Sequence, residues 1–139
     1  HDGKVYQIGK VEIRNSDGLV FIKPLVPAEE TPKYAFYPAS FGDSDSLKIG
    51  QTIVALAGRD SNTVSMGRVK QLETNTQKKV IGVISDIPTG RILPGSSIIN
   101  LSGEIVGIES VAGDSSSYRY IPINALKLAK TEALVELAK

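Results

Sequence analysis

The pattern of apolar and polar positions predicts a chain built mainly from short β-strands. In residues 5–14, Val11 and Ile13 alternate with charged neighbours, which predicts a half-buried strand. Residues 19–23 form an apolar run that predicts a buried strand. Pro24 and Pro27 are expected to end this strand, because proline has no N–H to donate to a sheet ladder.

The apolar runs continue at short, regular intervals and are separated by turn residues. Such spacing is typical of an all-β fold. After the last run, apolar residues recur at helical spacing, which predicts one amphipathic helix near the C-terminus with Asn124 as its N-cap. The further strands are expected at 51–57, 63–72, 80–85, 97–100, 104–110 and 118–123.

Composition narrows the classes of function. The 139 residues suffice for a folded core, and a net charge of +1 gives no general attraction to nucleic acid. No apolar run is long enough to span a bilayer, and there is no cysteine for a disulfide or thiol chemistry. With no phosphate-binding loop and no paired zinc ligands, we expect no cofactor, no metal, no nucleic-acid partner and no membrane span in this chain.

One acidic segment is compatible with either a calcium-binding loop or a capped turn. Asp43-Ser44-Asp45 could start a calcium loop, but the further oxygen ligands and the closing glutamate of such a loop are absent. We therefore expect a capped turn at this position.

Two segments carry a specific family resemblance. Residues 41–50 read F-G-D-S-D-S-L-K-I-G, and residues 100–108 read N-L-S-G-E-I-V-G-I. Both resemble trypsin-like serine proteases of the bacterial HtrA (Deg) family, and Y-I-P-I-N at 120–124 extends the resemblance. It implies a chymotrypsin-fold protein with a complete C-terminal six-stranded barrel and a closing helix in 41–139. Residues 1–40 would be the remnant of the N-terminal barrel and a linker.

The same resemblance implies that the catalytic machinery is degenerate. Counted back from Asn100 without a gap, the family's nucleophilic serine falls on Pro94 and its oxyanion-hole glycine on Ile92. Proline has neither a hydroxyl for attack nor an N–H for the oxyanion hole. A β-branched isoleucine also suits the unusual backbone angles of that glycine poorly.

The other two members of the triad are also missing from the expected places. The family's triad aspartate falls on Gly18, and the neighbouring Asp17 is better explained as a turn residue. His1 is the only histidine, and we interpret it as a terminal residue. The family's histidine lies in an upstream segment that this sequence does not contain, and a first residue other than methionine suggests a trimmed or processed chain.

Three hypotheses of function follow. The first is a non-catalytic protease homologue, a pseudoprotease, that binds a peptide or protein by strand addition. The second is an active serine endopeptidase seen as a fragment, with Ser97, or less well Ser96, as nucleophile and a base from upstream. The third is a purely structural module. Fold analogy alone does not choose among them.

The resemblance also carries expectations about context. Another chain or a missing segment would complete the first barrel, because half a barrel exposes a sheet edge. Since the family acts mostly outside the bacterial cytoplasm, an extracytoplasmic location is implied.

Overall fold

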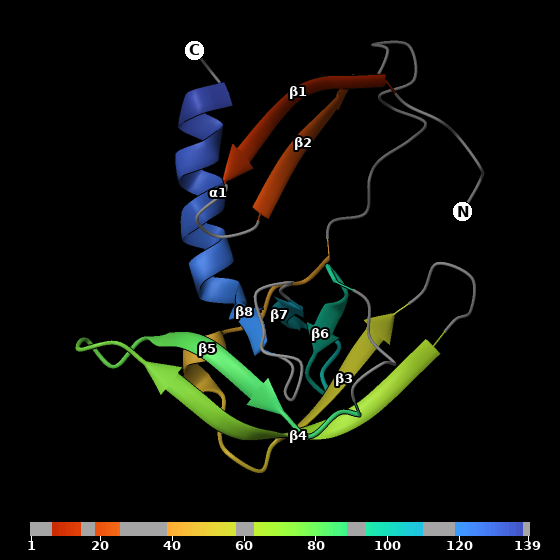
Figure 1. Cartoon of the computed structure of the whole chain (residues 1–139), viewed down its shortest axis with the longest axis vertical. Coiled ribbons are helices and arrows are strands. Elements are labelled where there is room, and N and C mark those ends of the chain that lie inside the picture. Colours follow the sequence, from red (N-terminus) through yellow and green to blue (C-terminus); the bar gives the residue numbers. More distant parts are fainter. Residues whose placement is uncertain are drawn as a thin grey trace. The chain divides into compact units, whose positions relative to one another are not determined.

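The computed structural model describes residues 7–14, 19–25, 39–57, 63–88, 94–109 and 119–137 (Figure 1). The chain divides into two compact units, of which the larger is Ala39–Leu128. The elements in chain order are β1 (Gln7–Arg14), β2 (Leu19–Leu25), a short 3₁₀ helix (Ser44–Ser46), β3 (Thr52–Ala57), β4 (Thr63–Thr74), β5 (Val80–Ser85), β6 (Ser97–Ile99), β7 (Ile105–Glu109), β8 (Arg119–Pro122) and α1 (Ile123–Leu137).

The larger unit is built around a closed antiparallel barrel. Its strands follow the order β3-β4-β5-β8-β7-β6, and β3 pairs with both β4 and β6 to close the ring. Closure removes the exposed strand edges that would otherwise be left unpaired. The predicted all-β fold with a complete six-stranded barrel and one C-terminal helix is therefore confirmed.

The barrel interior is filled mainly by β-branched side chains. Alternation sends side chains inward along the strands, as expected for a small barrel, and bulges interrupt it in the β4–β5 and β6–β7 pairs. Gly107 is required where β7 approaches β8, because a Cβ there would lie 3.0 Å from the Ile121 carbonyl oxygen. The core consists of Leu47, Ile53, Ala55, Val69, Val80, Val83, Ile87, Ile98, Val106 and Tyr120.

The two ends of this barrel differ in their connections. We call the end with the β4–β5 turn, the β6–β7 turn, the 3₁₀ helix and the start of α1 the turn end. At the opposite end β3, β5 and β7 finish and β4, β6 and β8 begin, and we call it the loop end. Its connections, 58–62, 86–96 and 110–118, include residues outside those described.

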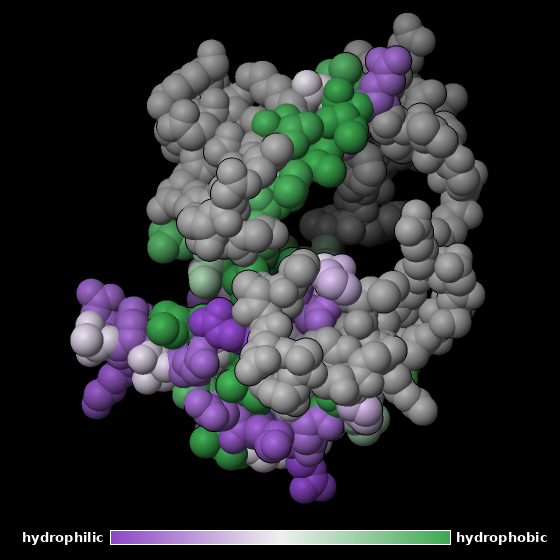
Figure 2. Space-filling view, in the orientation of Figure 1, coloured by the Kyte–Doolittle hydropathy of each residue, from purple (hydrophilic) through white to green (hydrophobic). Residues whose placement is uncertain are grey.

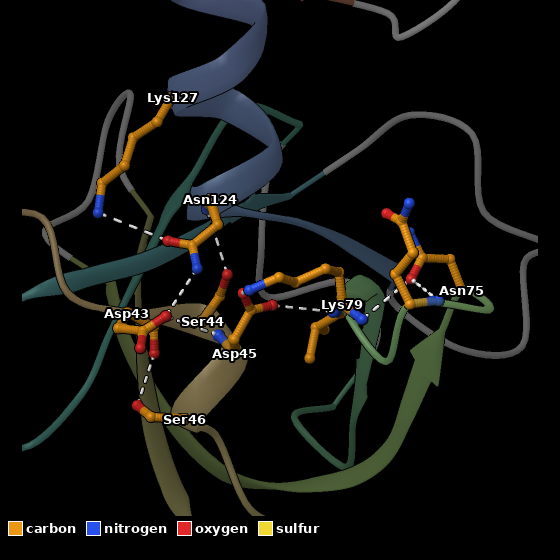
Figure 3. A network of polar contacts seen from close by, with 10 residues as sticks. Asp43, Ser44, Asp45, Ser46, Asn75, Lys79, Asn124 and Lys127 are labelled. Carbon is orange, nitrogen blue, oxygen red and sulfur yellow. Dashed lines mark hydrogen bonds and ion pairs between the residues drawn. The ribbon is translucent and has the colours of Figure 1, made fainter.

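The start of α1 corrects one prediction. Asn124 is not the N-cap, since the helix already begins at Ile123. The Asn124 N–H instead donates to the Ser44 hydroxyl at 3.2 Å, and its Nδ2 donates to Asp43 Oδ1 at 2.6 Å (Figure 3). A side chain from 80 positions earlier thus satisfies one of the free N–H groups of the first helical turn.

The two strands β1 and β2 form a separate antiparallel sheet. Pro24 lies inside β2, opposite Ile8, so the prediction that it ends the strand was wrong. Among the described strands β2 pairs only with β1, so it is an edge strand of this sheet, where proline is tolerated. Hydrophobic side chains gather along this ribbon, and Ile8, Val11, Val20 and Ile22 are all exposed (Figure 2). That these strands are a remnant of a first barrel stays a prediction.

Candidate functional site

The β6–β7 hairpin fixes the segment that the family resemblance singled out. Asn100 Oδ1 accepts hydrogen bonds from the N–H groups of Ser102 at 3.0 Å and Glu104 at 2.9 Å. Asn100 Nδ2 donates to Glu104 Oε2 at 2.8 Å, and Gly103 adopts a φ of 78°, which favours glycine. The N-L-S-G-E motif therefore has a structural explanation, namely a tight turn that sets the register of both strands.

Pro94 lies just before this hairpin, in an exposed turn with Gly95. Gly95 has a φ of 85°, and its N–H donates to the Glu109 carbonyl oxygen at 3.0 Å. The Glu109 N–H donates in turn to the Ser96 carbonyl oxygen at 2.9 Å. Consequently neither residue of the Pro94–Gly95 turn offers a free backbone N–H to an anion, because proline has none and glycine uses its own.

The two alternative nucleophiles occupy different environments. Ser97 is half-buried within β6, where it is paired with Leu56 on one side and Ile108 on the other. Within the described part of the chain, its hydroxyl makes no hydrogen bond. Ser96 is buried, with 9% of its surface exposed. A nucleophile needs a base within hydrogen-bonding reach, and no residue in the described ranges is a histidine.

Three of the predicted positions cannot be placed. Gly18, Ile92 and His1 lie outside the described residues. The positions expected for the triad and the oxyanion hole therefore cannot be compared with that of Pro94, which is described.

Sequence reasoning missed Glu109, the last residue of β7. It pairs with Tyr120, a core residue, and paired side chains project to the same face of a sheet. Glu109 therefore faces the barrel interior at the loop end. Only 5% of its surface is exposed, and among the described residues its buried Oε2 has no hydrogen-bond partner. Burial raises the pKa of this carboxyl group, because the charged form loses its hydration.

A second buried polar atom lacks a partner in the same interior. The Ser65 hydroxyl on β4 makes no hydrogen bond with any residue that the structure describes, although only 6% of Ser65 is exposed. By contrast the Tyr120 hydroxyl is paired with the Ser85 hydroxyl at 2.7 Å. Most buried polar groups in folded proteins are hydrogen-bonded, so an unpaired carboxylate oxygen needs an explanation.

The acidic segment 43–45 makes a structural network at the turn end (Figure 3). Asp43 caps the 3₁₀ helix by accepting from the Asp45 N–H at 3.0 Å, so the predicted capped turn is confirmed. Asp45 accepts from the Val80 N–H at 2.9 Å and from Lys79 Nζ at 3.0 Å. These bonds, the one from Val80 first, hold the pKa of Asp45 below its usual range.

Comparison with known proteins agrees with the motifs. The chain is 32% identical over 95 residues to a Serine protease Do-like HtrA of Lactobacillus helveticus, covering 61% of this chain and 22% of that protein. The chain is distantly similar to HtrA serine proteases. It is also 36% identical over 86 residues to the HtrA protein of the same description from Bacillus subtilis (strain 168), covering 52% of this chain and 19% of the relative. The chain thus spans about a fifth of the length of these HtrA relatives.

The fold comparison points the same way. A solved structure described as the crystal structure of Deg5 superposes with a TM-score of 0.67 at 20% identity, covering 85% of this chain and 56% of Deg5. The predicted trypsin-like fold is therefore confirmed. No protein-family model matches the chain. Within the described residues, no helix is long and apolar enough to cross a membrane.

Proposed function

We propose that this chain is a non-catalytic HtrA-like protease homologue that uses its barrel as a scaffold for binding a peptide or protein. The chain has a trypsin-like fold, but proline occupies the position that we assign to the nucleophile, and proline cannot perform the protease reaction. Its location would be extracytoplasmic, by analogy with HtrA proteins.

The observation that carries the proposal is proline at position 94. Counting back without a gap from Asn100, in the motif that resembles HtrA proteins, we assign the position of the nucleophilic serine to this residue. It supplies neither a hydroxyl nor an N–H group, and the neighbouring Gly95 N–H already donates to Glu109. Proline at this one position therefore lacks both the hydroxyl that would attack a carbonyl and the N–H that would help to stabilise the oxyanion.

Partner binding is supported by the β1–β2 sheet. Paired residues Val11 and Ile22 lie on one face, and both are exposed. A two-stranded sheet with an apolar face is marginally stable alone and gains by burial against further strands. We propose that another chain, or a further segment of the full protein, covers this face and completes a first barrel.

The test is direct labelling of the full-length protein with a fluorophosphonate probe, with casein cleavage in parallel and active trypsin as positive control. We expect neither labelling nor cleavage. Labelling that disappears in Ser97→Ala or Ser96→Ala, but persists in the exposed-turn control Ser102→Ala, would overturn the proposal and indicate an active protease.

Binding is tested separately. Peptides selected from a displayed random library are titrated against the full-length protein by fluorescence polarisation. Saturable binding of a defined sequence supports the scaffold function. A folded protein that selects no peptide contradicts it and favours the purely structural module.

A further inference from the structure

Glu109 faces the barrel interior beside its partner Tyr120, and a row of mostly small residues lies one step deeper in the barrel. Ser65 pairs with Ala55, Ala55 pairs with Ile98, and Ile98 pairs with Gly107, which makes one inward-facing row across β4, β3, β6 and β7. Three of these four residues are serine, alanine or glycine. Glu109 follows Gly107 by two positions on the same face, one step nearer the loop end.

The next positions toward the loop end are small as well. Ser96 is opposite Glu109, since its carbonyl accepts the Glu109 N–H, and Ser85 meets the hydroxyl of Tyr120. Small side chains occupy little volume, so this part of the barrel presents hydroxyl groups and one carboxylate where the rest of the interior is filled by isoleucine and valine.

The carboxylate is costly in this environment. A buried ionised group without a partner loses hydration and gains nothing in return, so natural proteins usually pair it or bind an ion with it. The described residues contain no group of three or more acidic, histidine or cysteine side chains that could hold a metal ion. A single carboxylate on an interior that also carries serine hydroxyls instead matches a monovalent cation that carries several N–H donors.

We propose that the loop end of the barrel holds a subsite for the cationic side chain of a lysine or arginine in a bound peptide, with Glu109 as its counter-ion. The inference rests on the proposed peptide-binding function and deepens it, because it names the chemical class of residue that the scaffold selects. The Ser65 hydroxyl, which also lacks a partner, is the second acceptor on the interior face.

The first experiment needs no peptide. Uniformly ¹⁵N-labelled full-length protein is titrated with n-propylguanidinium as the arginine probe and n-butylammonium as the lysine probe, with N-propylurea as the uncharged control. We expect saturable amide shifts centred on Glu109, Ser96 and Tyr120 with at least one cation, and none with the urea.

Two variants of Glu109 and one control test whether cation binding depends on the charge of Glu109 itself or on the net charge of the protein. Glu109→Gln should weaken cation binding at least tenfold, whereas Glu109→Asp, which keeps the charge on a shorter arm, should bind with intermediate strength. The matched control is Glu73→Gln. It makes the same charge change at a partly exposed carboxylate, which pairs with Arg119 at 2.8 Å. Unchanged binding in Glu109→Gln, or non-saturable shifts in the wild type, would overturn the subsite.

A second experiment keeps this inference distinct from the proposed function. Each lysine or arginine of a selected peptide is replaced by norleucine, and affinity is measured by fluorescence polarisation. Peptide binding with no loss on any replacement refutes the cationic subsite but leaves the scaffold intact. Cation binding at Glu109 without any peptide binding refutes the scaffold instead.

Discussion

The two ends of the barrel satisfy their polar groups differently. At the turn end, Asp43, Ser44 and Asp45 each accept a hydrogen bond from a backbone N–H, and Asn75 and Asn100 each accept two. At the loop end, Glu109 is buried with an unpaired oxygen, and the interior row behind it contains the unpaired Ser65 hydroxyl. The same strands connect both ends. The loop end also contains satisfied groups, such as the paired hydroxyls of Ser85 and Tyr120. Among the described residues, two of its buried polar atoms nevertheless lack a hydrogen bond, which is typical of a site that serves a ligand.

The largest change in unfolding free energy should come from removing a hydrogen-bonded buried hydroxyl at the turn end. Ser44 is fully buried, and its hydroxyl accepts the Asn124 N–H at the start of α1. Ser44→Ala should lower the free energy of unfolding by about 1–3 kcal/mol, because it leaves a helix N–H without a partner. The measurement is urea unfolding followed by circular dichroism.

The matched control is Ser46→Ala in the same 3₁₀ helix, whose exposed hydroxyl donates to the Asp43 carbonyl at 2.7 Å. Water can replace that bond, so a much smaller loss is expected. Equal losses in the two variants would contradict a special role for Ser44 in starting α1.

A sharper comparison uses two glutamates on one hairpin. Glu109→Leu removes the unpaired buried carboxylate at the loop end and should raise the free energy of unfolding by about 1–2 kcal/mol at neutral pH. Glu104→Leu removes a carboxylate that accepts from Asn100 at the turn end, and should lower it. Effects of opposite sign in urea unfolding support the contrast between the ends, and a loss in both variants contradicts it.

Lowering the pH should change the stability contributed by Glu109 at the loop end and by Asp45 at the turn end in opposite directions. Because burial raises the pKa of Glu109, its contribution to stability is fully present below its ordinary value of about 4.3 and is lost as pH rises through the raised pKa. The gain from Glu109→Leu should therefore grow from pH 4 toward neutrality. Its paired neighbours Tyr120 and Ser96 carry no charge in this range.

Asp45 behaves in the reverse way. Its pKa is lowered, so it contributes stability above its ordinary value of about 3.9 and loses it as pH falls through the lowered pKa. The cost of Asp45→Asn should shrink below pH 4. Urea unfolding of wild type and both variants at several pH values checks both slopes, and parallel curves for the two variants would contradict the assignment.

The sequence predicts the barrel well because its strands are short, apolar and separated by recognisable turns. The 80–85 strand matches β5 residue for residue, and the motif 100–108 correctly indicates a tight hairpin. The errors have non-local causes. Pro24 is tolerated because β2 is an edge strand, and Asn124 loses its capping role because Ser44 reaches the helix from far along the chain.

The candidate site is harder to predict for the same reason. Whether Glu109 faces water or the core depends on its pairing with Tyr120 and on closure of the barrel, which no single segment encodes. Alternation in the run I-V-G-I-E places Glu109 on the strand face of Gly107. The register between β6 and β7 shifts at Val106, which is also a core residue, so the turn motif alone does not fix which face turns inward.

The smallest expected change in unfolding free energy tests whether the turn end is stabilised by the Lys79–Asp45 ion pair or by hydrogen bonds to backbone N–H groups. Lys79 is largely exposed, and its ion pair with Asp45 at 3.0 Å is open to solvent and salt. Lys79→Met should leave the unfolding midpoint almost unchanged, with any small loss vanishing in 1 M NaCl, because the Val80 N–H still holds the Asp45 carboxylate. Urea unfolding at low and high salt is the measurement. A large, salt-resistant loss would mean that the turn end depends on the Lys79 ammonium itself, and the hydrogen-bond account of its stability would have to be abandoned.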